Sequence, residues 1–256
     1  AQKFENPRDG ILMISSKEFR SSSPGIWEYV EKMTDFPFDE MIYSWNLRLA
    51  EGEGFRLYLS LYMSDDTESP WLYAGYWGSV KPRGDDIMTT FSAGIVDYDH
   101  VKLTASARGL RFRVVSEGAK PLAQAPEMRV IFTDNYTEAE PVKAYVEIPA
   151  RVLDVPLRAQ TDTSGVRIPD TCQSAALCSA MQYFGKEVPL EEVAEMIRDP
   201  EYHLRGIWPR IVGASIQKGF NAYIDRFRNW TKVREALSAN KVILCSITMP
   251  ENDTYI

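Results

Sequence analysis

The sequence predicts an α+β protein in which the strands precede the helices. Up to about residue 150, short segments of alternating apolar and polar residues are separated by Gly, Pro, Asp and Asn, which is typical of antiparallel strands. Beyond Pro149, apolar residues recur at helical spacing. The charge changes at the same point: residues 1–150 carry 16 basic and 23 acidic side chains, whereas residues 151–256 carry 13 of each. We therefore expect two domains, 1–150 and 151–256.

The first domain is predicted to be an antiparallel β-sandwich. Phe55, Leu57 and Leu59 alternate with polar or aromatic neighbours, as in a strand with one buried face. About seven such strands, joined by turns, favour a sandwich. The expected strands are 43–52, 55–64, 71–80, 100–107, 110–118, 127–134 and 143–152. A helical turn is expected within 21–33, with Ser23 as its N-cap and Pro24 at the first helical position.

The second domain begins with the run TCQSAALCSAMQYFG (171–185), which predicts a helix that ends at Gly185. Three more helices are expected at 189–197, 204–219 and 229–240, and two strands at 220–227 and 241–249. The segment PLEEVAEMI opens on a proline with two acidic residues in its first turn, which suits the positive end of a helix dipole.

Composition excludes several classes of function. The net charge of −7 and pI near 5.1 argue against nucleic acid as the main partner, because a phosphate-binding surface is basic. No apolar stretch approaches the roughly 18 residues that span a membrane. No phosphate-binding loop or metal-binding motif occurs, so neither a cofactor nor a metal is expected. The start AQKFENP is no signal peptide but is compatible with a mature terminus after cleavage, which makes a secreted, periplasmic or cell-surface location a hypothesis.

Two cysteines lie six residues apart in the helix predicted at 171–185. Cys172 lies in its first turn, where free N–H groups and the positive end of the helix favour a thiolate and can hold an oxyanion. Cys178 lies about 240° around the helix, so the two sulfurs cannot pair. Cys178 is therefore interpreted as a small buried residue, and Cys245, within an expected strand, is treated likewise. On spacing alone, Cys172 could be structural or reactive.

The runs DVPLRAQ (154–160), TCQSAALCSAMQYFG and KEVPLEEVAEMI together resemble the start of a papain-like cysteine peptidase. The resemblance is strongest to the bacteriocin-processing type, family thirty-nine of the cysteine peptidases. In that family an aromatic residue and Gly end the helix thirteen residues after the catalytic Cys, the distance from Cys172 to Gly185. The first domain, with FDEMIYSWN and PWLYAGYWG, resembles the accessory domain of some bacterial relatives. The resemblance implies an antiparallel β-sandwich followed by a truncated papain-like peptidase domain.

The resemblance also implies the site residues. Cys172 would be the nucleophile, and Gln160 would supply the side-chain amide of the oxyanion hole. The substrate would be a peptide or protein. The sequence departs from the family where Gln173 and Ser174 replace the usual Gly-Pro, and the loop between Gln160 and Cys172 is longer than in papain.

A papain-like site also needs a histidine oriented by Asn or Asp. The sequence holds two histidines: His100, in the first domain, and His203, only 31 residues after Cys172. Both are interpreted as structural residues, because the family's histidine follows the Cys by seventy to a hundred residues. The catalytic histidine and its Asp or Asn partner are therefore expected beyond Ile256.

A different class of function remains open: a binding protein built on an inactive peptidase fold, with a peptide or a cell-surface glycan as its ligand. Trp45, Trp71 and Trp77 lie close to several tyrosines and could form a surface on which a sugar stacks. Such aromatic residues also commonly fill the core of a β-sandwich. The cleavage preference and the oligomeric state do not follow from the sequence.

Overall fold

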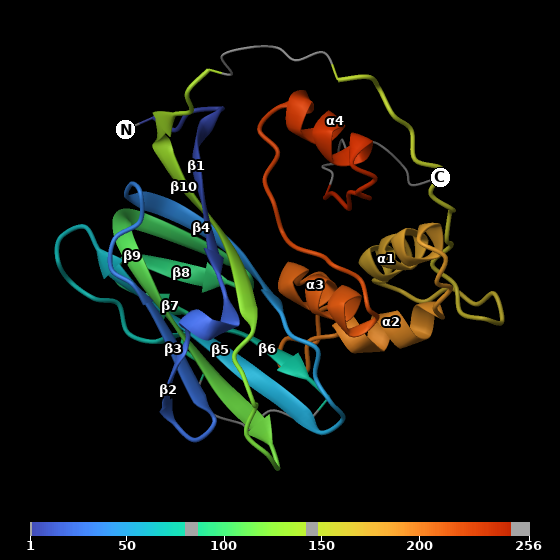
Figure 1. Ribbon diagram of the computed structural model, residues 1–256, viewed down its shortest axis with the longest axis horizontal. Helices are drawn as coiled ribbons and strands as arrows, with labels where there is room; N and C mark the ends of the chain where they lie inside the picture. Colours follow the sequence, from blue (N-terminus) through green and yellow to red (C-terminus); the bar gives the residue numbers. More distant parts are fainter. Residues whose placement is uncertain (1, 80–86, 142–147, 247–256) are drawn as a thin grey trace.

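The computed structural model describes residues 2–79, 87–141 and 148–246. The described chain forms a ten-stranded antiparallel sheet followed by four α-helices, so the predicted α+β order is confirmed (Figure 1). None of the described helices is long and apolar enough to cross a membrane.

The strands and helices have the following bounds. The strands are β1 (Pro7–Ile14), β2 (Arg20–Ser23), β3 (Ile26–Glu31), β4 (Phe38–Asn46), β5 (Glu53–Met63), β6 (Leu72–Gly78), β7 (Thr90–Phe91), β8 (Gly94–Asp97), β9 (His100–Gly118) and β10 (Glu127–Glu138). A short 3-10 helix, η1 (Ser16–Glu18), separates β1 from β2. The α-helices are α1 (Cys172–Tyr183), α2 (Leu190–Ile197), α3 (Trp208–Gln217) and α4 (Trp230–Ser238), each within a range predicted to be helical.

Strand β9 links the whole sheet. Its first residues pair with β4 and β8, and its later residues pair with β3 and β5. Two separate strands were predicted here, but the chain continues through Gly109, where a Cβ atom would lie 2.4 Å from the backbone oxygen of Glu31. A glycine at this position therefore lets β9 pass close to the end of β3 without a break.

The pairing does not produce the two separate sheets of the predicted sandwich. All ten strands belong to one hydrogen-bonded sheet, with the order β1-β10-β4-β9-β3-β2 along its main path. Non-paired strands nevertheless face each other across the core: the Trp45 ring of β4 meets the Phe55 ring of β5 edge-on, and the Tyr43 hydroxyl donates to the Ala74 carbonyl of β6. The long strand β9 thus allows one sheet to cover its own apolar face.

Several local predictions were wrong. The expected helical turn within 21–33 is a hairpin of β2 and β3, in which Gly25 occupies the turn with φ +79°. Strand β1 was not predicted. Residues 220–227 form no strand, because the backbone of Ile224 bonds to the side chains of Ser44 and Arg129 in place of a neighbouring strand. Residues 241–246 and 148–152 also form no strand, and the rest of those two predicted strands lies outside the described residues.

Helix α3 joins the helical part to the sheet (Figure 1). The Gln217 side chain makes two hydrogen bonds with the backbone of Leu49. At the other end of the helix, Asp99 accepts a hydrogen bond of 2.6 Å from the Trp208 N–H. Gly213 faces Trp77 so closely that a Cβ atom would lie 2.8 Å from the indole.

One cluster of buried apolar side chains contains residues from both sides of the predicted boundary at residue 150. The division into two domains remains a prediction.

The Arg210 side chain of α3 is the most densely bonded group at this contact. It is only 3% exposed. Its guanidinium donates to four backbone carbonyls, those of Tyr76 on β6 and of Met196, Ile197 and Arg198 at the end of α2. The carbonyls that end a helix have no partner within the helix, so Arg210 satisfies the end of α2 and fastens it to β6.

Replacement of Arg210 should therefore destabilise the whole protein. Asp199 is buried and its carboxylate lies 3.8 Å from the Arg210 guanidinium. Arg210→Ala would leave four carbonyls without their donor and this carboxylate without its cation, at a cost of about 3–5 kcal/mol in the free energy of unfolding. Urea unfolding followed by tryptophan fluorescence measures this. The control is Arg198→Ala, because the Arg198 side chain is exposed and its loss should change stability by less than about 0.5 kcal/mol. Equal stabilities of the two variants would contradict the role given to Arg210.

Candidate active site

Cys172 is the first residue of α1 and is exposed. The preceding residue, Thr171, is buried and turns its side chain away from the helix, so that its hydroxyl donates to the Ile168 carbonyl. The Thr171 side chain, at the N-cap position, makes no hydrogen bond to the N–H groups of the first turn. The thiol therefore lies beside backbone donors at the positive end of a helix, as the sequence predicted.

Cys178 has the opposite environment. It is fully buried, beside the buried side chains of Leu177 and Met181, and burial raises the pKa of its thiol to about 11. A thiol with such a pKa stays protonated and unreactive at neutral pH. The prediction that Cys178 serves packing is confirmed. Cys245, which was expected to be buried in a strand, is instead exposed.

Gln160, the predicted oxyanion-hole residue, lies at the start of a tight loop that leads to α1. Its backbone carbonyl accepts a hydrogen bond of 2.9 Å from the Ile168 N–H, and a bridge joins Thr161 to Arg167. The loop closes on Asp162, whose carboxylate accepts from three groups of Ser164 and Val166. The long loop thus folds back on itself, so that the Gln160 backbone lies beside Ile168, shortly before Cys172 in the sequence. Among the described residues no hydrogen bond joins the two side chains, so the role of Gln160 stays a prediction.

Neither histidine is joined to Cys172 by a hydrogen bond in the described part of the chain. His100 begins β9, and its Nε2 atom lies 2.6 Å from Glu40 Oε1. His203 is exposed in the loop between α2 and α3, with the left-handed φ of +58°. Both residues therefore have the structural environments that the sequence indicated.

The His100–Glu40 pair belongs to an ionic contact between the sheet and residues 220–228. Arg226 also binds Glu40, and Arg228 binds the Asp9 carboxylate. Burial favours protonation of Glu40, but the hydrogen bonds from His100 and Asn135 and the charge of Arg226 outweigh it and hold the pKa of Glu40 well below its usual range. Glu40 thus remains charged and fastens the segment between α3 and α4 to the sheet.

The sequence analysis did not predict the contact that Gln173 makes. Gln173 Oε1 lies 3.0 Å from Cys172 Sγ and accepts a hydrogen bond from the thiol. Gln173 also faces Gly206, where an added Cβ atom would lie 3.0 Å from Gln173 Nε2. The only signal in the sequence was the departure from Gly-Pro after the cysteine, and the partner Gly206 is 33 residues away.

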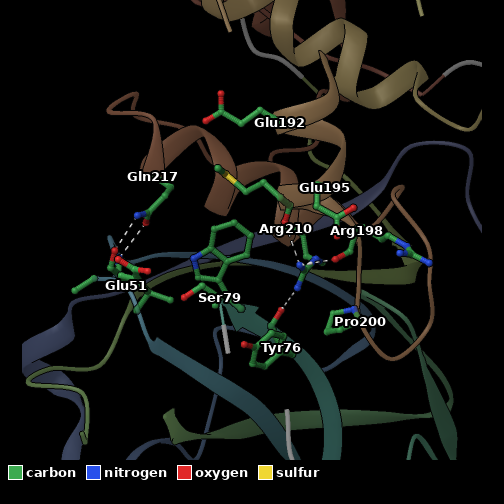
Figure 2. Close-up of a pocket in the computed structure, with 14 residues that line it drawn as sticks. Glu51, Tyr76, Ser79, Glu192, Glu195, Arg198, Pro200, Arg210 and Gln217 are labelled. Atoms are coloured by element: carbon green, nitrogen blue, oxygen red, sulfur yellow. Dashed lines mark hydrogen bonds between the residues drawn. The ribbon is translucent and has the colours of Figure 1, made fainter. Parts of the chain in front are cut away.

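A separate cavity of about 730 Å³ lies between the sheet and helices α2 and α3 (Figure 2). Cys172 is not among its lining residues, which are Leu49, Ala50, Glu51, Tyr76, Trp77, Gly78, Ser79, Glu192, Glu195, Met196, Arg198, Pro200, Arg210 and Gln217. The guanidinium of Arg210 is directed to backbone carbonyls and leaves little capacity for an anion. The remaining charged lining consists of three glutamates, of which Glu192 is paired with Lys218, and the exposed Arg198. Among the described residues no group of His, Cys, Asp and Glu is arranged to hold a metal.

The three tryptophans considered for a sugar-stacking surface do not form one. Trp45 and Trp77 are buried in the core, as the alternative interpretation predicted. Trp71 is partly buried, and the guanidinium carbons of Arg111 and Arg113 lie 4.9 and 4.0 Å from its ring centre. The face of Trp71 is therefore already engaged by cations from β9.

Comparison with known proteins supports the interpretation of the second part of the chain. Residues 152–253 match the Peptidase_C39 like family, a range that begins before Gln160 and includes α1 to α4. This match supports a papain-like cysteine peptidase domain in that part of the chain and leaves the sheet unassigned. No curated protein and no solved structure matches the chain.

The three thiols should differ in reactivity. Below pH 7, Cys172 should react with iodoacetamide at least about tenfold faster than Cys245, because only Cys172 lies at a helix N-terminus. Cys178 should remain unlabelled until the protein unfolds. Mass spectrometry of the labelled peptides measures each rate. Because Cys172 and Cys245 are both exposed, equal rates at these two positions would show that exposure alone controls the reaction.

Proposed function

We propose that this protein is a cysteine peptidase of the bacteriocin-processing type, which hydrolyses peptide or related amide bonds through a thioester on Cys172. The observation that carries the proposal is the exposed thiol at the first residue of α1, within the segment that matches the peptidase family. The sheet would act as an accessory domain beside the peptidase domain, and the location would be secreted, periplasmic or at the cell surface.

The proposed chemistry follows from the groups at the start of α1. The Cys172 thiolate attacks the carbonyl carbon of the substrate, and the backbone N–H of Cys172 and the Gln160 side chain hold the oxygen that becomes negative. Collapse of this intermediate breaks the C–N bond, and the amine leaves with a proton. Water then hydrolyses the thioester, which releases the carboxylic acid and restores the thiol.

The reaction also requires a general base that takes the thiol proton and returns it to the amine. His100 is engaged by Glu40, and His203 has no hydrogen bond to Cys172 in the described residues. The activity proposed here therefore requires a further histidine, oriented by Asp or Asn, in addition to these two.

Two cysteine substitutions separate reactivity from packing. Cys172→Ala should abolish hydrolysis with little change in melting temperature, because the side chain is exposed. Cys178→Ser should retain hydrolysis but destabilise the protein by roughly 1–3 kcal/mol, since it buries an unpaired hydroxyl. Hydrolysis of a peptide library and thermal unfolding measure the two effects. Undiminished hydrolysis by Cys172→Ala would overturn the proposed mechanism.

The cavity between the sheet and helices α2 and α3 favours a second candidate function, the binding of peptides without turnover. Its lining includes three glutamates, of which Glu192 is already paired with Lys218. Glu51 and Glu195 are the acidic groups that would attract a peptide with cationic side chains. The fully buried tryptophans make a glycan the less favoured ligand.

Titration of the full chain with a lysine-rich peptide tests this second function. Glu195→Gln should weaken binding about threefold to tenfold, as expected for a charge that faces a cationic ligand. Glu187→Gln is the matched control, because Glu187 is exposed outside the cavity. Equal binding of acidic and basic peptides would argue against the cavity as a cation site, and binding of an oligosaccharide alone would favour the glycan.

A further inference from the structure

Gln173 is the hydrogen-bond partner that the described residues provide for the Cys172 thiol. The two residues are adjacent in the first turn of α1, and the distance from Cys172 Sγ to Gln173 Oε1 is 3.0 Å. A thiol can donate to this oxygen, whereas a thiolate has no proton to donate. The amide therefore presents its acceptor, and not its N–H2 group, to the sulfur.

The position of Gln173 depends on the loop between α2 and α3, residues 198–207. A Cβ atom on Gly206 would lie 3.0 Å from Gln173 Nε2 and 3.8 Å from the Cδ atom of the same amide. The amide therefore rests against the bare Cα atom of Gly206. Since any larger residue would push on the end of a flexible side chain, the first consequence would be a movement of Gln173.

The same loop is held by the sheet. Asp199 is 1% exposed and accepts hydrogen bonds from the N–H groups of Glu201 and Tyr202, which fixes the turn. The Tyr202 ring lies edge-on to Tyr98, with 4.9 Å between ring centres. Glu201 lies 3.6 Å from the buried Arg56 guanidinium. Gly206 is thus part of a loop with an anchored conformation.

We propose that Gln173 is a positioning residue that restrains the Cys172 thiol, and that Gly206 holds Gln173 in the restraining orientation. The inference rests on the proposed function only in that it concerns the same nucleophile. With its oxygen toward the sulfur, the amide retains the thiol proton. Loss of that proton breaks the hydrogen bond to the amide, so Gln173 acts against premature reaction.

Other ionisable groups on these two elements must be considered as sources of the same effect. Asp170 precedes α1, and the loop carries Arg198, His203 and Arg205 besides the anchored acids. Arg205 is engaged with the Ala194 carbonyl. Substitutions that leave all of these groups in place, such as Gln173→Leu and Gly206→Ala, isolate the contribution of the amide.

The test is the rate of Cys172 alkylation by iodoacetamide as a function of pH, followed by mass spectrometry on the full chain. Gln173→Leu removes both ends of the amide and should raise the rate at neutral pH about threefold to tenfold, as expected for loss of one hydrogen bond to the thiol. The half-maximal rate should move to lower pH. Gln173→Glu should slow the reaction, because a carboxylate opposes a neighbouring thiolate. The control Gln182→Ala, at the far end of α1, should match the wild type.

Gly206→Ala should raise the rate in the same direction, and the double variant Gln173→Leu/Gly206→Ala should react no faster than Gln173→Leu alone. Such non-additivity would show that Gly206 acts through Gln173. Unchanged or slower alkylation of Gln173→Leu would overturn the inference, and an additive effect of Gly206→Ala would remove Gly206 from it. Alkylation requires no turnover, so these outcomes are independent of whether Cys172→Ala abolishes hydrolysis.

Discussion

The arrangement of sheet and helices depends on the buried guanidinium of Arg210. A helix of eight residues such as α2 has little stability by itself, because half of its carbonyls lack partners within the helix. Arg210 of α3 supplies partners for the last two of them, those of Met196 and Ile197, and also binds a carbonyl of β6. Helix α2 packs on α1, and the loop after α2 carries Gly206. The candidate nucleophile and its amide neighbour are thus supported by a contact made some distance from them.

Charge complementarity explains how the neutral second part of the chain attaches to the acidic sheet. Arg226 and Arg228 bind Glu40 and Asp9, while Asp225 binds Arg129 of β10 at 2.8 Å. These pairs hold residues 220–228 along the sheet in an extended course that leads to α4 (Figure 1). Part of the acidic excess of the sheet therefore binds basic residues of the same chain. These carboxylates need no external partner to account for them.

The candidate site combines two local elements and one non-local element. Cys172 owes its exposure and its N–H neighbours to its place in the first turn of α1, a property of a few consecutive residues. Gln160 is returned toward α1 by a loop that its own backbone closes with Ile168. Gln173 is different, because its orientation is set by Gly206 and thus by the anchoring of the loop on the sheet. Reactivity at the thiol is in this way linked to the integrity of the whole fold.

The sequence by itself determined the order of strands and helices, the four helix positions, and the contrast between an exposed Cys172 and a buried Cys178, because these depend on local periodicity and on position within one helix. Only the tertiary structure decided how strands pair. The continuity of β9 depends on a close approach at Gly109, and the extended course of 220–228 depends on side chains of β4 and β10. Contacts between residues far apart in the chain, such as Gln173 with Gly206 or Arg210 with β6, leave no local pattern, because each partner is compatible with many others until packing selects one.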